Sequence, residues 1–144
     1  MSKRVYELFL FDVYIAIIKI EIVSSKFNDA EALLHDFISW DSIIREFEIV
    51  GEATKILIDN KIVDSKYRIV VDFRNKIIHH YFGIDADGVW SIIHNDLLDF
   101  KTHIKEKILE IENEKFKIIF NSVLEDNKNY ITIIKKLNEL NWKT

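Results

Sequence analysis

Apolar residues recur three and four positions apart along most of the chain, which is the spacing of one face of an α-helix. The first such segment runs from about Lys3 to Val23 and carries Val5, Leu8, Phe9, Val13, Ile17 and Ile20. A second, longer segment begins at Asp29, a residue suited to capping a helix start, and continues to about Asp59. The pattern therefore predicts two long helices joined through the polar residues 24–28.

The same spacing predicts further helices in the rest of the chain. A third helix starts near Asp64, a fourth runs from Val89 to about Ile111, and residues 83–88 between them are expected to form a loop. Beyond Ile111 the pattern predicts two shorter helices hinged at residues 125–127. Repeated helices without strand signals favour an all-α fold, an antiparallel helical bundle with a helical C-terminal extension.

Residues that break helices are scarce, which agrees with this prediction. Proline is absent and glycine occurs only at positions 51, 83 and 88. Gly51 falls inside the second predicted helix, where glycine costs about 1 kcal/mol relative to alanine. A close approach by the backbone of a neighbouring helix would offset that cost.

Composition narrows the class of protein. A chain of 144 residues is long enough for one domain with its own hydrophobic core. Because cysteine is absent, the chain has neither disulfides nor thiolate metal sites. Charges at Asp12, Lys19 and Glu21 interrupt the most apolar segment, and no signal-peptide cleavage site follows Lys3 and Arg4. We therefore expect a core helix of a cytoplasmic protein rather than a membrane span.

Charge is distributed unevenly along the chain. The formal net charge is −4, yet residues 61–81 hold five lysines and arginines against two aspartates. A small basic patch on an acidic body suits a focused phosphate site better than a long nucleic-acid groove. A solvated helix face is the alternative interpretation of such a run.

The segment from Arg74 to Tyr81 gathers the chemistry that a phosphodiester site needs. Arg74 offers a permanent forked cation for a phosphate, His79 can move protons near neutral pH, and the Tyr81 hydroxyl can donate a hydrogen bond or act as a nucleophile. Capping of a helix C-terminus would explain an arginine and histidines equally well. A metal site is not expected, because the adjacent His79 and His80 diverge on a helix and no second histidine follows at ligand spacing.

Helical geometry restricts how these side chains can meet. Positions 74 and 81 lie within about 20° of each other around a helix axis, whereas position 79 lies about 140° from position 74. Arg74 and His79 therefore converge only if the helix unwinds before Gly83, or if two chains each supply part of one site.

The motif and its flanking residues resemble those of a known family. Arg74, four intervening residues, His79, His80 and Tyr81 match the R-x₄-H-x-Y motif of HEPN-domain proteins, in particular the HepT type. Three blocks, one of which contains this motif, follow the family pattern nearly in order: residues 43–53, residues 73–85, and Val89-Trp90 with Asp96-Leu97. The resemblance implies a HEPN-like bundle of four to five helices over residues 1–111, followed by a helical extension over residues 112–144 whose role does not transfer.

The resemblance also implies a function. HepT-type proteins are toxins of type VII toxin–antitoxin pairs, metal-independent endoribonucleases that need no cofactor and form homodimers in which both motifs line one cleft. Arg74 and His79 would be the catalytic pair for attack by the RNA 2′-hydroxyl on the adjacent phosphate. A small nucleotidyltransferase would silence the toxin by transferring AMP from ATP to Tyr81. A non-catalytic subunit that presents nucleotide or substrate to a nucleotidyltransferase is the alternative.

Several neighbouring residues could support this site. Arg45 could extend the phosphate patch, and Glu52 could orient Arg74 or His79, although a surface ion pair is an equal alternative for the glutamate. Asn75, Lys76 and His80 lie within the motif and are predicted to contact RNA or nucleotide, while His80 occupies a variable position of the family pattern.

Overall fold

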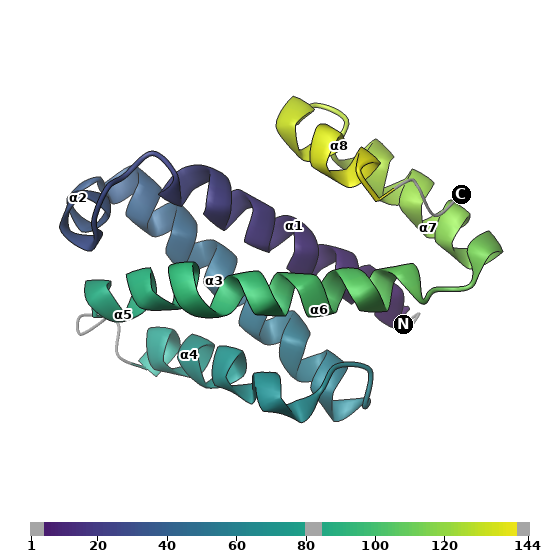
Figure 1. Ribbon diagram of the computed structural model, residues 1–144, viewed down its shortest axis with the longest axis horizontal. Helices are drawn as coiled ribbons and strands as arrows, with labels where there is room; N and C mark the ends of the chain where they lie inside the picture. Colours follow the sequence, from purple (N-terminus) through teal and green to yellow (C-terminus); the bar gives the residue numbers. More distant parts are fainter. Residues whose placement is uncertain (1–4, 80–84, 141–144) are drawn as a thin grey trace.

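The fold is an all-α bundle, seen in a computed structural model that describes residues 5–79 and 85–140 (Figure 1). No strand occurs within these ranges. The helices are α1 (Tyr6–Ser24), α2 (Ala30–His35), α3 (Phe37–Asp59), α4 (Arg68–His79), α5 (Ala86–Ser91), α6 (Leu97–Leu109), α7 (Asn113–Asp126) and α8 (Ile131–Asn138). None of the described helices is long and apolar enough to cross a membrane.

Four long helices form the body of the bundle. The helix α3 packs against α1 along one face and against α4 along another, and α6 packs against α1 (Figure 1). The short helices α2 and α5 contact each other at one end of the bundle. This arrangement confirms the predicted antiparallel bundle and places α4, the helix of the motif, beside α3.

The prediction of one continuous second helix is wrong, because the helix is interrupted at Asp36. Asp29 caps α2 as expected, accepting a hydrogen bond from the Ala32 amide at 2.8 Å. Asp36 then adopts an extended conformation and caps α3 through the Ser39 amide at 3.0 Å. Both helices bury apolar residues against one core, so the apolar spacing continues across the break.

The fourth predicted helix is also divided. Asp85 caps α5 by accepting from the Asp87 amide at 3.0 Å, so Gly88 lies inside a helix rather than in the predicted loop. A π-helical turn over Ile92–Asp96 then joins α5 to α6. The extra residue of a π-turn resets the helix register. Of the residues that the apolar spacing predicts to face inward, Ile93, Leu97, Phe100, Ile104 and Ile108 are buried, and Trp90 is half-buried.

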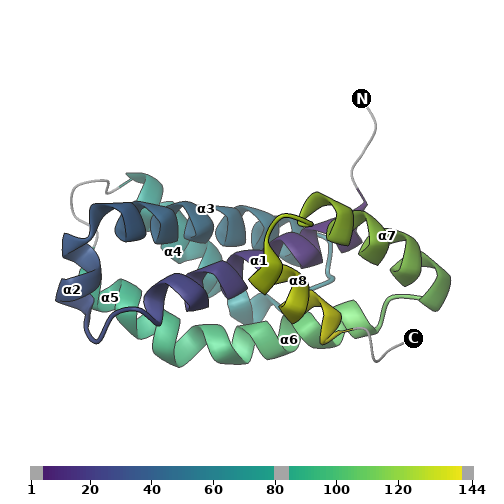
Figure 2. The same cartoon turned by 90° about the horizontal axis from the view of Figure 1, so that it is seen from above.

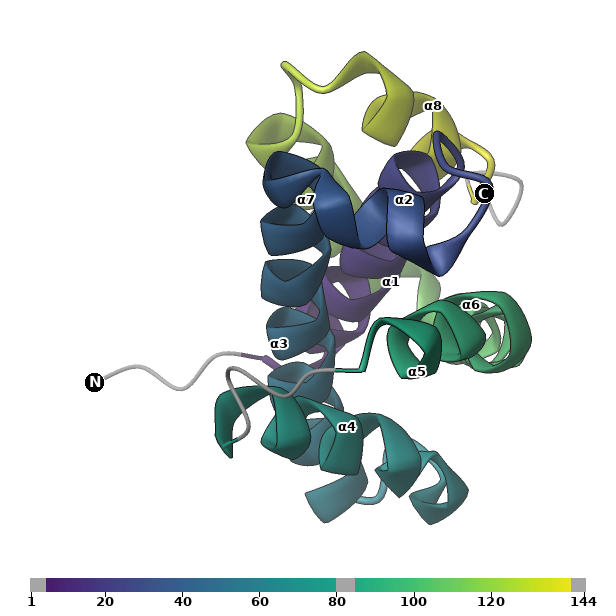
Figure 3. The ribbon, with the colours of Figure 1, turned by 90° about the vertical axis from the view of Figure 1, so that its left-hand side faces the viewer.

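The C-terminal helices pack on α1, on the side of the molecule opposite α4 (Figures 2 and 3). The ring of Phe11 lies 6.3 Å from Phe116 and 6.2 Å from Phe120, measured between ring centroids. All three rings are buried. The two predicted helices of the extension are thus present, and they share the hydrophobic core of the bundle.

A buried tyrosine fixes the start of α4 to α6. The chain leaves α3 through Lys61, whose left-handed backbone conformation (φ 61°) turns it toward the short 3₁₀ turn Ser65–Tyr67 that precedes α4. The Tyr67 hydroxyl donates to the Asp99 carboxylate at 2.9 Å, and the Tyr67 ring lies 4.8 Å from that of Phe100. Burial, and then the hydrogen bond and charge of Asp99, raise the pKa of Tyr67 to about 12.

This raised pKa predicts a loss of stability in alkaline solution. The unfolded chain releases the tyrosine proton near pH 10, whereas the folded chain holds it to about pH 12, so the free energy of unfolding falls across that interval. Urea denaturation between pH 8 and 12 should show a shallower alkaline decline for Tyr67→Phe. Burial also raises the pKa of Tyr14, so part of the decline remains. An unchanged decline in Tyr67→Phe, matching that of the exposed-site control Tyr130→Phe, would contradict the assignment.

Candidate active site

Arg74 packs against a glycine where α4 approaches α3. A Cβ atom placed on Gly51 would overlap the Cβ of Arg74 and lie 2.5 Å from its Cγ. The expectation that a neighbouring helix comes close to Gly51 is therefore confirmed. The residue of α4 that meets Gly51 is Arg74, the first residue of the predicted motif.

The surroundings of Arg74 combine apolar packing with few polar contacts. Phe73 forms an edge-on contact with Phe47 of α3, with ring centroids 4.9 Å apart, and Ile77 is buried one turn further along α4. The Arg74 side chain is half-buried, and its Nε atom is buried without a hydrogen-bond partner within residues 5–79 and 85–140. The Nη1 atom donates to Asn75 Oδ1 at 3.2 Å. A phosphate oxygen is the type of acceptor that the terminal nitrogens of this guanidinium suit.

Of the other predicted residues, only Asn75 shares a hydrogen bond with Arg74 among the described residues. Lys76 is exposed on α4, and Glu52 is exposed on α3. Arg45 forms an exposed ion pair with Glu48 at 3.5 Å. Among the described residues no ion pair joins Arg74 to a carboxylate, so the suggestion that Glu52 orients Arg74 gains no contact in support.

The end of the motif reaches the limit of the described residues. His79 is the last residue of α4, so the helix continues through the position predicted for proton transfer. His80 and Tyr81 lie outside the described residues. A helical backbone through position 79 keeps positions 74 and 79 about 140° apart around the axis of α4.

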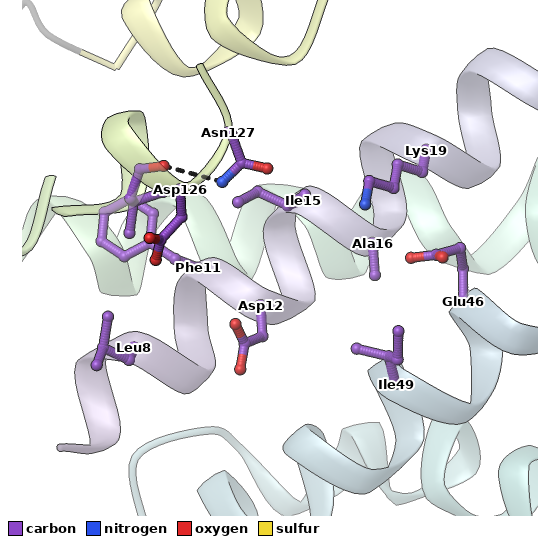
Figure 4. Close-up of a pocket in the computed structure, with 11 residues that line it drawn as sticks. Leu8, Phe11, Asp12, Ile15, Ala16, Lys19, Glu46, Ile49, Asp126 and Asn127 are labelled. Carbon is purple, nitrogen blue, oxygen red and sulfur yellow. Dashed lines mark hydrogen bonds between the residues drawn. The ribbon is translucent and has the colours of Figure 1, made fainter. Parts of the chain in front are cut away.

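A groove of about 230 Å³ lies elsewhere, between α1, α3 and the end of α7 (Figure 4). Its lining includes Asp12, Lys19, Glu46 and Asp126 but not Arg74. Figure 4 shows the Lys19 ammonium and the Glu46 carboxylate directed toward the same end of the groove. Burial raises the pKa of Glu46, and the charges of Lys19 and Arg45 oppose the shift. No local pattern in the sequence marks Glu46, because half-burial of one carboxylate depends on tertiary packing.

Comparison with known proteins supports the family resemblance. A family model described as ribonuclease HepT-like matches residues 14–108. A candidate RNase of Methanocaldococcus jannaschii is 34% identical over 87 residues, covering 58% of this chain and 72% of the relative. A second candidate RNase of that organism is 30% identical over 108 residues, covering 73% of this chain and 98% of the relative.

Similarity extends to a protein that carries the family name. A protein of Thermococcus cleftensis named probable ribonuclease HepT is 36% identical over 63 residues, covering 42% of this chain and 57% of its own length. No solved structure matches this chain. The family match spans most of the bundle, including α3, α4 and the crossing that holds Arg74. The chain therefore belongs to the HepT-like ribonuclease family and is a HEPN-domain protein of the HepT type.

Proposed function

We propose that this protein is the toxin of a type VII toxin–antitoxin pair, a cytoplasmic endoribonuclease that cleaves RNA without a metal ion. The observation that carries the proposal is the seating of Arg74 at the α3–α4 crossing, with no carboxylate paired to it among the described residues. An arginine without a carboxylate partner in the described part of the chain is available to an external anion. Its place in a matching family motif makes an RNA phosphate the preferred anion.

The proposed reaction divides the chemistry between two residues. The RNA 2′-oxygen attacks the adjacent phosphorus while His79 accepts the 2′-hydroxyl proton, and the bond from phosphorus to the 5′-oxygen breaks with a proton delivered to that oxygen. The products are a 2′,3′-cyclic phosphate and a 5′-hydroxyl end. Arg74 stabilises the extra negative charge of the phosphorane. DNA lacks the attacking hydroxyl and is not cleaved.

Helix geometry favours a site shared between two chains. The helix α4 continues through His79. Unwinding of the helix before His79, which would bring this side chain toward Arg74, therefore has no support. Positions 74 and 79 then lie on different sides of one helix, and a homodimer in which each chain supplies part of the site resolves the conflict. Asn75, Lys76, Arg45, His80 and Glu52 would support the binding of RNA or nucleotide around this shared site.

Regulation by a nucleotidyltransferase completes the proposal. The partner would transfer AMP from ATP to the Tyr81 hydroxyl, with release of pyrophosphate. The added phosphate would bring negative charge and bulk two positions beyond the end of α4, within the same motif as Arg74. Such a group would compete with the RNA phosphate for the guanidinium.

The first test is RNA cleavage in the presence of a chelator. Arg74→Ala and His79→Ala should each lower kcat by about 10²- to 10⁴-fold, the range expected for a charge-stabilising or proton-transfer group. The control is His35→Ala, which removes an exposed histidine paired with Glu31 at 3.6 Å. Full activity in His79→Ala, or cleavage that requires a metal ion, would refute the reaction. A wild-type protein that binds the nucleotidyltransferase but cleaves no RNA would support the non-catalytic alternative.

Mixing two inactive variants tests the shared site. If one chain supplies Arg74 and the other His79, a mixed dimer of Arg74→Ala and His79→Ala holds one intact site. Refolding the two variants together in equal amounts should recover about one quarter of wild-type activity for a two-fold dimer. A site formed within one chain would give no recovery above the separate variants.

Mass spectrometry tests the modification. Incubation with ATP and the nucleotidyltransferase encoded beside this protein should add AMP to the peptide containing Tyr81 and lower RNA cleavage in proportion. Tyr81→Phe should stay unmodified, whereas Tyr130→Phe, which alters an exposed tyrosine on the C-terminal extension, should be modified like the wild type. AMP found on another residue, or no AMP, would contradict this part of the proposal.

A further inference from the structure

Gly51 occupies a position where a side chain has no room. It is buried in the middle of α3, and a Cβ atom there would overlap the Arg74 Cβ and lie 3.4 Å from the carbonyl oxygen of Val70. Among the described residues no glycine has a positive φ, so Gly51 is not required for an unusual backbone conformation. Space between the two helices is therefore the reason for glycine at this position.

The obstructing atoms belong to the stem of Arg74 rather than to its flexible end. The backbone of α4 fixes the Cβ position, so a rotamer change cannot relieve the overlap. The edge-on contact of Phe47 with Phe73 holds the two helices together beside the crossing. An alanine at position 51 would therefore move α4, and Arg74 with it.

The nitrogens of the Arg74 guanidinium differ in their surroundings. The Nε atom is buried and has no hydrogen-bond partner among the described residues, while Nη1 donates to Asn75 Oδ1. An enclosed stem leaves the arginine few rotamers, so little side-chain freedom remains to be lost when an anion binds. The terminal nitrogens carry four of the five N–H donors of a guanidinium.

We propose that Gly51 is a positioning residue for Arg74: its missing side chain seats the arginine stem between α3 and α4 and directs the terminal nitrogens to the RNA phosphate. The inference rests on the proposed function for the identity of that phosphate. The seating itself is independent of any activity. The two parts can therefore be tested separately.

Substitution by alanine separates this role from ordinary helix propensity. Replacing a glycine inside a helix by alanine is normally stabilising. Gly88 of α5 provides the matched control, because its added Cβ would make only an ordinary 3.4 Å contact with Asp85 Oδ2. Gly88→Ala should leave the melting temperature unchanged or raise it, whereas Gly51→Ala should lower it by roughly 3–10 °C.

A spectroscopic measurement reports on the seating without any assay. The chain contains four arginines, so their Nε–H resonances are few, and Arg74→Lys identifies the one that belongs to Arg74. In the wild type this proton should exchange slowly with water, because the atom is buried. Gly51→Ala should accelerate that exchange at least tenfold while Gly88→Ala leaves it unchanged. Slow exchange in Gly51→Ala would overturn the proposal.

If Gly51→Ala alone does not fold, the same substitution can be tested in an Arg74→Gly variant. Arg74→Gly removes the Cβ and Cγ atoms that an alanine at position 51 would meet. In that background the addition of Gly51→Ala should lower the melting temperature by less than about 2 °C. An equally large fall in both backgrounds would show that the overlap with Arg74 is not the cause, and would overturn the proposal.

Kinetics then connect the seating with RNA cleavage. Gly51→Ala should lower kcat by about 10- to 100-fold with a smaller change in KM, because a small misplacement of a transition-state group acts mainly on the chemical step. In the Arg74→Ala background the same change should cause no further loss of kcat. Equal losses in both backgrounds would indicate a purely structural role. Absence of RNA cleavage in the wild type would refute the proposed function, while the exchange and stability measurements would still decide the seating.

Discussion

The close approach of α4 to α3 is the contact on which the candidate site depends. At the crossing a glycine of α3 faces the stem of Arg74, and the paired rings of Phe47 and Phe73 pack beside it. Apolar burial on both helices supplies the stabilisation, and the missing side chain sets how near the backbones can come. A single steric condition thus links core packing to the position of a charged group. The cost is a buried N–H without an acceptor, which the surrounding packing has to offset.

The residues of the motif differ in their place relative to α4. Arg74 sits within the packed interface of two helices, whereas His79 ends the helix and Tyr81 follows it in sequence. Rigid support suits a group that stabilises charge, whereas the modification proposed for Tyr81 would require access by a partner enzyme. The far end of the helix is fixed separately, by the hydrogen bond from Tyr67 to Asp99.

Local patterns in the sequence predicted most of the helices, because apolar spacing and capping residues are local properties. They did not reveal the break at Asp36, since the residues on both sides pack on one core and preserve the spacing. The π-turn over Ile92–Asp96 was likewise hidden, because one extra residue barely disturbs a three-four pattern. For the site, the position of Gly51 indicated that some helix would come close. Which residue it would meet depends on the register between α3 and α4, and no local pattern encodes that register.

The surroundings of α1 explain why its sequence lacks the polar stripe of a surface helix. It contacts α3 and α6 from the bundle and α7 and α8 from the C-terminal extension, so it is covered on more than one side. Its partly buried Asp12 and Lys19 face the groove that remains. A family member that ends after the equivalent of α6 would expose the surface that Phe116 and Phe120 cover here. Such a protein must either carry polar residues along that surface or bury it against another molecule. In a relative's sequence, the balance of apolar and polar residues in the first helix should therefore indicate whether other helices of the same chain cover that helix.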